Sequence, residues 1–318
     1  MNRVFKRCLI TGIAGSGGSY LANYINKINK KIKIYGTYRK KGHINKINNI
    51  KKISLYKNNL DNVNSIKKLL KKINPDVIFH LASNADVRES FDNPYNVIKN
   101  NSLLTLNLLE AVRLCKSKSL IIICSTSEVY GKVKKKDIPI KESQIFSPAN
   151  PYSMSKSFQD LLAQTYYRCF KLNIIITRMF SYTNARRKNL FQSSFARQIN
   201  QFRRGEINFV KHGNLKSIRT FMDIEDAMKA YWLTALKGKI GEIYNIGGDK
   251  IISVGDYLKK LIKISGVQAK TKLCRELVRP VDVTLQIPSV SKFRRDTGWK
   301  PNINFEESIK KLLNETKK

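Results

Sequence analysis

The sequence has few acidic residues, few histidines and no cysteine motif, and each shortage excludes a class of protein. Its 318 residues hold 23 Asp and Glu against 60 Lys and Arg, which gives a formal net charge of +37. The three histidines form no pair at helical spacing, so we expect no metal site. The five cysteines are scattered without a CxxC motif, and we expect them to be reduced thiols rather than a disulfide framework.

Long apolar segments are also missing. No run reaches the roughly 18 apolar residues that a bilayer-spanning helix needs, and the segment after Met1 is too short and too charged for a signal peptide. We therefore expect a cytoplasmic protein with no membrane partner. Apolar residues nevertheless make up 42% of the chain, which is enough to build a folded core.

The excess of positive charge has two explanations. A phosphate-rich partner such as a nucleic acid would favour it. AT-rich coding, which enriches Lys, Asn and Ile together, would produce the same excess. The basic residues are spread along the chain and no aromatic-rich RNA-binding motif interrupts them. We favour the compositional explanation and expect no nucleic-acid partner.

Short β-branched runs alternate with amphipathic stretches in the first 180 residues. The strand-like runs lie at 7–10, 32–35, 76–82, 120–124 and 174–176, and helical spacing recurs at 20–28, 63–73, 103–114 and 155–170. This alternation predicts an α/β fold with a Rossmann-type, doubly wound parallel sheet. Beyond residue 180, prolines and isolated glycines interrupt the pattern. We expect a first domain at 1–180 and a smaller C-terminal lobe at 181–318, partly interleaved with the first.

Glycines cluster where the first predicted strand gives way to the first helix. Gly12, Gly15 and Gly18 permit a tight turn, leave room for a pyrophosphate and let the helix pack closely on the strand. The amides at the helix N-terminus would face the phosphates, so this turn predicts a dinucleotide site. Residues 36–41, at the end of the second strand, contain Arg39 but no acid. Because an arginine can hold a ribose 2′-phosphate, we predict NADP rather than NAD.

Tyr152 and Lys156 lie one helical turn apart. A tyrosine has an unperturbed pKa of about 10, so it can act as a base near neutral pH only with help from a nearby cation. Thr126 and Glu128 follow the central apolar strand and would face the same crevice. A basic regulatory protein that merely senses NADP would have no use for these four side chains together.

Nearly the whole chain resembles the extended short-chain dehydrogenase/reductase family, and within it the nucleotide-sugar branch. Residues 10–22 and 125–131 resemble the GDP-mannose 4,6-dehydratases. The second segment contains Thr126-Ser127-Glu128, a Thr-x-Glu pattern that is typical of sugar 4,6-dehydratases. Residues 219–226 and 279–283 instead resemble the GDP-4-keto-6-deoxymannose reductases. Ser181 stands where relatives carry an asparagine, which leaves the sugar open.

The resemblance implies a lyase that converts GDP-mannose to GDP-4-keto-6-deoxymannose, with Thr126, Glu128, Tyr152 and Lys156 as catalytic residues. Tyr152 and Lys156 would also contact the cofactor. The other implied residues are Asn59 and Leu60 toward the cofactor, and Ser83, Ser181, Arg187, Arg219 and Arg279 toward the substrate. We expect that Arg219 and Arg279 clamp the diphosphate and can be replaced without loss of stability. A 4-keto-6-deoxyhexose reductase or an epimerase is the alternative function, and a homodimer or homotetramer is expected.

Overall fold

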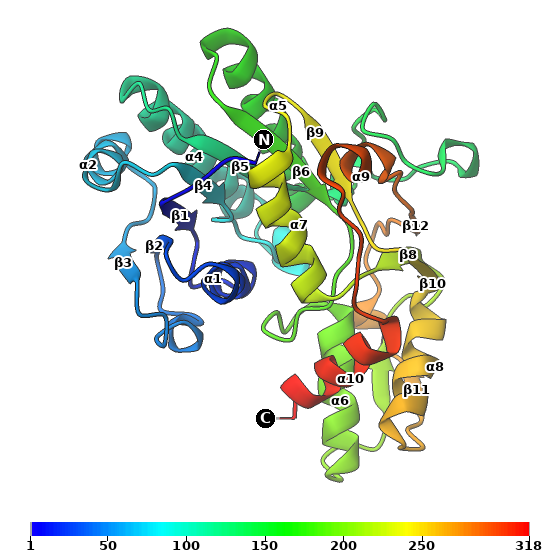
Figure 1. Ribbon diagram of the computed structural model, residues 1–318. Coiled ribbons are helices and arrows are strands. Elements are labelled where there is room, and N and C mark those ends of the chain that lie inside the picture. Colours follow the sequence, from blue (N-terminus) through cyan, green and yellow to red (C-terminus); the bar gives the residue numbers. More distant parts are fainter. Residues whose placement is uncertain (1, 318) are drawn as a thin grey trace.

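A seven-stranded parallel sheet forms the centre of the computed structural model, which describes residues 2–317 (Figure 1). Its strands are β1 (Arg7–Thr11), β2 (Lys33–Tyr38), β3 (Ile53–Lys57), β4 (Val77–His80), β5 (Leu120–Thr126), β6 (Ile174–Met179) and β9 (Ile243–Ile246). They lie in the order β3-β2-β1-β4-β5-β6-β9. The strands from β1 to β3 are added toward one edge of the sheet and those from β4 onward toward the other, so the order of the strands reverses between β1 and β4. Ligands of open α/β sheets bind at such a switch point. The predicted doubly wound α/β fold is confirmed.

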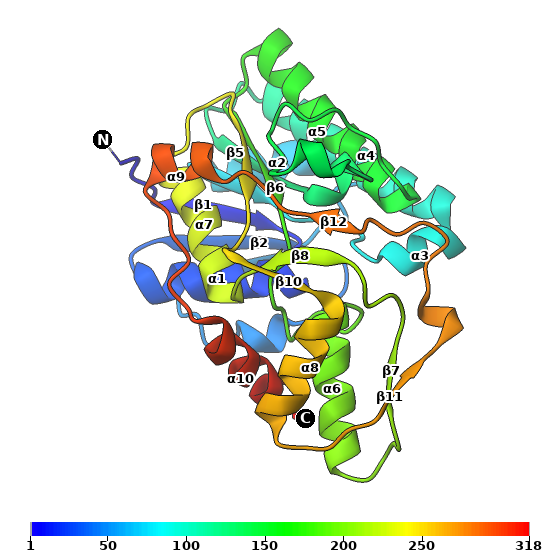
Figure 2. The ribbon, with the colours of Figure 1, turned by 90° about the vertical axis from the view of Figure 1, so that its right-hand side faces the viewer.

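Helices cover both faces of this sheet, as Figures 1 and 2 show. One face packs against α1 (Ser16–Ile28) and α7 (Ile224–Lys237), and the other packs against α2 (Val63–Ile73), α4 (Pro94–Leu114) and α5 (Pro151–Phe170). Leu21 and Trp232 belong to the first core, and Leu109 and Ala163 to the second. Burial on both sides explains why β5 is a continuous apolar run rather than an alternating one.

Local sequence signals place the helix that carries the predicted tyrosine and lysine. Asn150 caps α5, because its side chain accepts a hydrogen bond from the Ser153 amide at 2.8 Å while the Ser153 hydroxyl accepts one from the Asn150 amide at 3.0 Å. Pro151 occupies the first helical position, where its missing N–H costs nothing. The start of α5 is therefore fixed beside the end of β5.

The chain beyond residue 180 builds a smaller lobe and also returns to the main sheet. The lobe contains α6 (Phe191–Arg203), β7 (Val210–His212), β8 (Ile218–Phe221), β10 (Lys250–Ser253), α8 (Val254–Ser265), β11 (Thr271–Leu273), β12 (Leu285–Gln286) and α10 (Phe305–Glu315). Strands β10, β8 and β12 form one small sheet, and β11 pairs with β7 (Figure 2). Strand β9 is part of the main sheet and α7 packs against it, although both come from the chain beyond residue 180. The predicted first domain and the predicted C-terminal lobe are therefore interleaved. The boundary at residue 180 stays a prediction.

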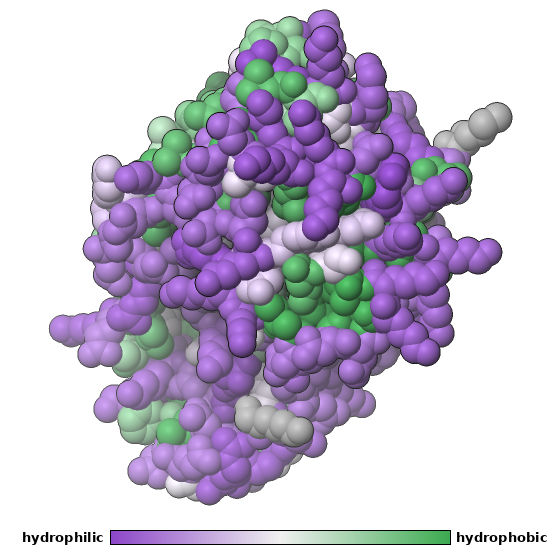
Figure 3. Space-filling view, turned by 90° about the vertical axis from the view of Figure 1, so that its left-hand side faces the viewer, coloured by the Kyte–Doolittle hydropathy of each residue, from purple (hydrophilic) through white to green (hydrophobic). Residues whose placement is uncertain are grey.

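Short helices complete the chain: α3 (Val87–Asp92) lies after β4 and α9 (Ser291–Thr297) after β12. Hydrophilic side chains cover most of the face that Figure 3 shows, with small hydrophobic patches between them. Within residues 2–317, no helix combines the length and the apolar character that crossing a membrane requires.

Candidate active site

One cleft, at the carboxyl edge of the main sheet, collects side chains from both parts of the chain. It lies where the order of the strands reverses, between the turn after β1 and the loop after β4. The sequence-predicted residues that line it are Gly12, Gly15, Gly18, Ser83, Thr126, Glu128, Tyr152, Lys156, Ser181, Arg187, Arg219 and Arg279. The fold thus brings together residues that the chain separates by more than 260 positions.

The glycine-rich turn is packed so closely that a side chain at Gly12 or Gly18 would collide with the backbone. Gly12 has a φ of +69°, and a Cβ there would lie 2.8 Å from the Ala82 Cα atom. A Cβ at Gly18 would approach the Gly12 carbonyl oxygen. Gly15 is the N-cap of α1 and provides no side-chain cap, so the first amides of the helix face the cleft without a side-chain partner. These features fit a pyrophosphate group.

The residues predicted to read the adenosine ribose line an adjoining cavity. Arg39, Asn59 and Leu60 lie there, and this cavity shares Gly12 and Ser83 with the main cleft. The Arg39 side chain is exposed, and its Nη1 donates a hydrogen bond to the Asn100 Oδ1 atom at 3.0 Å. No acidic side chain lines this cavity among the described residues. The surroundings suit a 2′-phosphate.

A buried chain of hydrogen bonds, which the sequence did not reveal, ties the glycine turn to the helices behind it. The Thr11 hydroxyl lies 2.8 Å from His80 Nδ1, and His80 Nε2 lies 2.9 Å from the Thr105 hydroxyl. Gln159 on α5 donates to Thr105. Burial lowers the pKa of His80 to about 3, so the ring is neutral at physiological pH. The network fixes β1 and β4 against α4 and α5.

Tyr152 lies almost completely buried at the floor of the cleft. Burial raises the pKa of Tyr152 to about 12, and the Arg187 charge and a hydrogen bond with Thr126 oppose this rise. The nearby Glu128 charge adds to it. At neutral pH the phenol is therefore protonated, and it needs positive charge nearby to give up its proton.

Lys156 has a different contact from the one its spacing suggests. Its ammonium donates a hydrogen bond to the backbone carbonyl of Cys124, near the end of β5. Burial lowers the pKa of Lys156 to about 8. The Arg187 charge lowers the pKa of Tyr152, and the Arg187 guanidinium also donates to the Ala85 carbonyl. Arg187 lines the same cleft as Tyr152, a placement that helical spacing does not reveal.

Glu128 lies in the short helix Ser127–Tyr130 that follows β5. Its backbone amide donates to the Thr126 hydroxyl at 3.3 Å, which turns the chain into the cleft. The carboxylate accepts a hydrogen bond from the Asn150 side-chain amide at 3.0 Å. On its other side, the Arg279 guanidinium lies 3.8 Å away. Asn150 therefore links Glu128 to the helix that carries Tyr152.

The two arginines predicted to hold the diphosphate come from the smaller lobe. Arg219 on β8 is buried and donates to the Val283 carbonyl at 3.0 Å and to the Gln286 side chain. Arg279 lies in the loop between β11 and β12 and is partly exposed. Ser181 follows β6 and lines the same cleft. The cleft thus has a cationic end beside the predicted catalytic residues.

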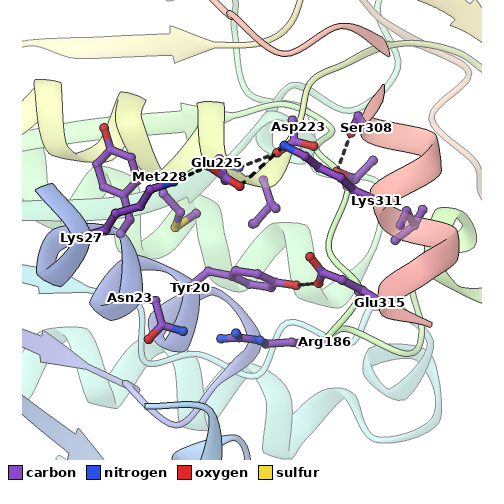
Figure 4. Close-up of a pocket in the computed structure, with 15 residues that line it drawn as sticks. Tyr20, Asn23, Lys27, Arg186, Asp223, Glu225, Met228, Ser308, Lys311 and Glu315 are labelled. Atoms are coloured by element: carbon purple, nitrogen blue, oxygen red, sulfur yellow. Dashed lines mark hydrogen bonds and ion pairs between the residues drawn. The ribbon is translucent and has the colours of Figure 1, made fainter. Parts of the chain in front are cut away.

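A second cavity lies between α1, α7 and α10 (Figure 4). Polar side chains on its walls connect the helices that line it: Tyr20 on α1 donates to Glu315 on α10, and Glu225 on α7 forms ion pairs with Lys27 on α1 and Lys311 on α10. These contacts hold α10 against α1 and α7. None of the predicted catalytic or binding residues lines it.

Comparisons with known proteins agree with this geometry. GDP-mannose 4,6 dehydratase 2 from Caenorhabditis elegans is 26% identical over 340 residues, which cover 97% of this chain and 88% of the relative. GDP-6-deoxy-D-mannose reductase from Pseudomonas aeruginosa is 28% identical over 243 residues, covering 76% of this chain and 80% of the relative. The crystal structure of UDP-glucuronic acid 4-epimerase from Bacillus cereus, in complex with UDP-glucuronic acid and NAD, has a TM-score of 0.86 at 26% identity and covers 98% of this chain and 99% of its own.

The fold and these relatives define the class of protein as an extended short-chain dehydrogenase/reductase of the nucleotide-sugar type. A sequence model of the GDP-mannose 4,6 dehydratase family matches residues 9–312, so the chain belongs to that family. The resemblance found in the sequence is confirmed at this level.

Proposed function

We propose that the protein is an NADP-dependent 4,6-dehydratase that converts GDP-mannose to GDP-4-keto-6-deoxymannose. The observation that carries the proposal is the Glu128 carboxylate, which lies in the same cleft as Tyr152 and Thr126. Withdrawing a carboxylate from water costs free energy, and a simple reductase has no need for one. A dehydratase needs it as a base for the C5 proton.

The cofactor would lie along the glycine turn and the adjoining cavity. When bound, NADP would supply the hydride-transfer chemistry of the reaction, for the oxidation at C4 of the sugar and the reduction at C6. The first turn of α1 would hold the pyrophosphate, and Arg39 would hold the 2′-phosphate. Asn59 and Leu60 would contact the adenosine end.

The chain's own residues would handle the protons. Tyr152 would take the proton of the C4 hydroxyl, with the Arg187 charge favouring the phenolate, and we propose that the buried Lys156 ammonium assists it. Thr126 would donate a hydrogen bond to the C4 oxygen as negative charge develops there. Since a 4-keto group makes the C5 proton acidic, Glu128 can then remove it and pass it to the C6 hydroxyl, so that the C6–O bond breaks and water leaves. Once C6 has been reduced, Tyr152 can return its proton to C5, which restores the phenolate.

The substrate would enter with its diphosphate toward the smaller lobe. Arg219 and Arg279 offer charge-assisted hydrogen bonds to phosphate oxygens. Ser83 and Ser181 line the walls between these arginines and Tyr152, where a hexose would lie. The same arrangement would serve any nucleoside diphosphate hexose, and the GDP linkage rests on the family.

One observation favours a 4-keto-6-deoxyhexose reductase as the second candidate. The pKa of about 12 makes Tyr152 a proton donor at neutral pH, as the reduction of a ketone requires. A reductase would consume one NADPH for each product molecule, whereas a dehydratase restores its cofactor in every turnover.

The deciding experiment is a panel of GDP-, UDP-, CDP- and dTDP-hexoses incubated with the purified protein and analysed by mass spectrometry. We expect loss of water from GDP-mannose without added reductant, and a deuterium placed at C4 should reappear at C6. Glu128→Gln should slow the reaction by roughly 10²- to 10⁴-fold. NADPH consumption with a 4-keto-6-deoxy sugar, and no water loss from any hexose, would establish the reductase instead.

We also propose that the protein is a homo-oligomer built on the outer face of α4 and α5, which pack side by side. Met154, Phe158 and Leu161 follow each other at helical spacing on α5 and are 40% to 52% exposed. Leu103 is exposed on α4. Phe158→Glu combined with Leu161→Glu should yield monomers in analytical ultracentrifugation, while Ile145→Glu, at an exposed apolar position outside both helices, should leave the assembly unchanged.

A further inference from the structure

Glu128 is held from two sides in the cleft. One carboxylate oxygen accepts the hydrogen bond from Asn150, and the other lies 3.8 Å from the Arg279 guanidinium. The Glu128 side chain is only 14% exposed. Arg279 therefore faces the carboxylate oxygen that does not accept the hydrogen bond from Asn150.

The two cleft arginines are anchored very differently. Arg219 donates to Val283 and Gln286 and lies 3.7 Å from the Asp282 carboxylate, with its side chain 9% exposed. The Arg279 side chain is 37% exposed, and within residues 2–317 its only polar contact is with Glu128. Arg219 is thus a fixed part of the cleft wall, whereas Arg279 can turn by changing its own rotamers.

We propose that Arg279 covers Glu128 in the substrate-free enzyme and that the substrate's diphosphate draws Arg279 away, so that the base is exposed only when a nucleotide sugar is bound. This inference rests on the proposed function for the role of Glu128. A diphosphate carries more charge than one carboxylate and can accept two parallel hydrogen bonds from a guanidinium. It therefore competes successfully for Arg279, with the fixed Arg219 holding it in place.

The exchange has a chemical consequence. Once Arg279 has moved away, its guanidinium no longer stands between the Glu128 carboxylate and a proton of the substrate. Binding energy from the diphosphate, which takes no part in the reaction, would thus be used to prepare the base at the sugar. A hexose 1-phosphate lacks the second phosphate and should be a poor substrate in its rate constant as well as in its affinity.

The test is a double-mutant cycle on the binding of GDP to NADP-loaded protein, measured by isothermal titration calorimetry; UDP replaces GDP if GDP does not bind. Glu128→Gln should tighten GDP binding by roughly 3- to 10-fold, because Arg279 is then free. Arg279→Gln should weaken it by about tenfold or more. In the Arg279→Gln background, Glu128→Gln should change the affinity by less than about twofold.

The cycle separates the proposed exchange from plain repulsion between a carboxylate and a diphosphate. Repulsion alone would make Glu128→Gln tighten GDP binding equally in both backgrounds, and that result would overturn the proposal. Glu89→Gln removes one negative charge outside the cleft and should leave the affinity unchanged. Thermal melts check that each variant is folded, and Glu128→Ala replaces Glu128→Gln if the latter is not.

The result of the GDP-binding cycle does not depend on whether the protein catalyses the loss of water. If no hexose loses water but the cycle shows coupling, the competition for Arg279 stands and the dehydratase assignment fails. If water loss depends on Glu128 but Glu128→Gln changes the GDP affinity equally in the wild type and in Arg279→Gln, the dehydratase assignment stands and the covering of Glu128 by Arg279 is wrong.

Discussion

The Lys156 ammonium donates its hydrogen bond to the carbonyl oxygen of Cys124. The lysine is almost completely buried, and burial lowers its pKa from 10.5 to about 8. It is therefore still charged at pH 7, at a cost in stability, because water solvates an ammonium better than this site does. Between pH 8 and 10.5, Lys156 binds more protons in the unfolded chain than in the folded one. The contribution of Lys156 to the free energy of unfolding therefore rises with pH over that window.

Lys156→Met should consequently separate stability from activity. We expect the free energy of unfolding at pH 7 to rise by roughly 1–3 kcal/mol, because the buried charge is gone, while catalysis is lost. The gain should shrink as the pH increases from 8 toward 10.5, where the wild-type lysine becomes neutral in the folded state. Urea denaturation at pH 7 and pH 9.5 measures both effects. A variant less stable than the wild type at pH 7 would contradict this account.

Replacing Arg219 and Arg279 by alanine should change the free energy of unfolding by different amounts. The expectation that both can be replaced without loss of stability therefore needs correction for Arg219. Arg219 is buried and supports Val283 and Gln286. Arg219→Ala should lower the free energy of unfolding by roughly 2–4 kcal/mol in urea titrations, since it leaves buried polar groups without partners. Arg279→Ala should change it by less than about 0.5 kcal/mol. Both should weaken the binding of nucleotide sugars.

The fold and the members of the cleft were predictable because the signals are local. The glycine turn, the apolar strand that ends at Thr126 and Glu128, and the spacing of Tyr152 and Lys156 each lie within a few residues of sequence. Carboxyl ends of parallel strands meet at one edge of a sheet, so these groups had to come together.

The pairing inside the cleft was not predictable. Glu128 meets Arg279 across 151 positions of sequence, and only the packing of the smaller lobe on the sheet decides that contact. Helical spacing predicts that Lys156 acts on Tyr152, and that role stays a prediction, whereas the Arg187 charge that lowers the pKa of Tyr152 comes from a loop with no periodic pattern. Rotamers and loop paths, which sequence patterns do not encode, determine both.

Arg39 should decide the choice of cofactor. Wild-type protein should bind NADP at least about tenfold more tightly than NAD, because Arg39 lies in a cavity that lacks acidic side chains among the described residues. Arg39→Asp should reverse the preference, since a carboxylate accepts hydrogen bonds from the ribose hydroxyls and repels the 2′-phosphate. Lys41→Asp makes the same change of charge outside the cavity and should leave the order of affinities intact. Tighter binding of NAD than NADP by the wild type at physiological salt would refute this assignment.

Asn150 should act as a positioning residue for Glu128. Its side chain has two functions: its oxygen caps α5 through the Ser153 amide, and its nitrogen donates to the Glu128 carboxylate. Asn150→Ser keeps the first function, since serine is an equally good N-cap, and removes the second without adding a charge beside Glu128, because its side chain is too short to reach the carboxylate. We therefore expect the free energy of unfolding to change by less than about 1 kcal/mol, while the rate of water loss falls by roughly tenfold or more because the base is no longer oriented. Asn150→Ala loses both functions and should reduce stability as well. If Asn150→Ser keeps full activity, the hydrogen bond to Glu128 does not position the base.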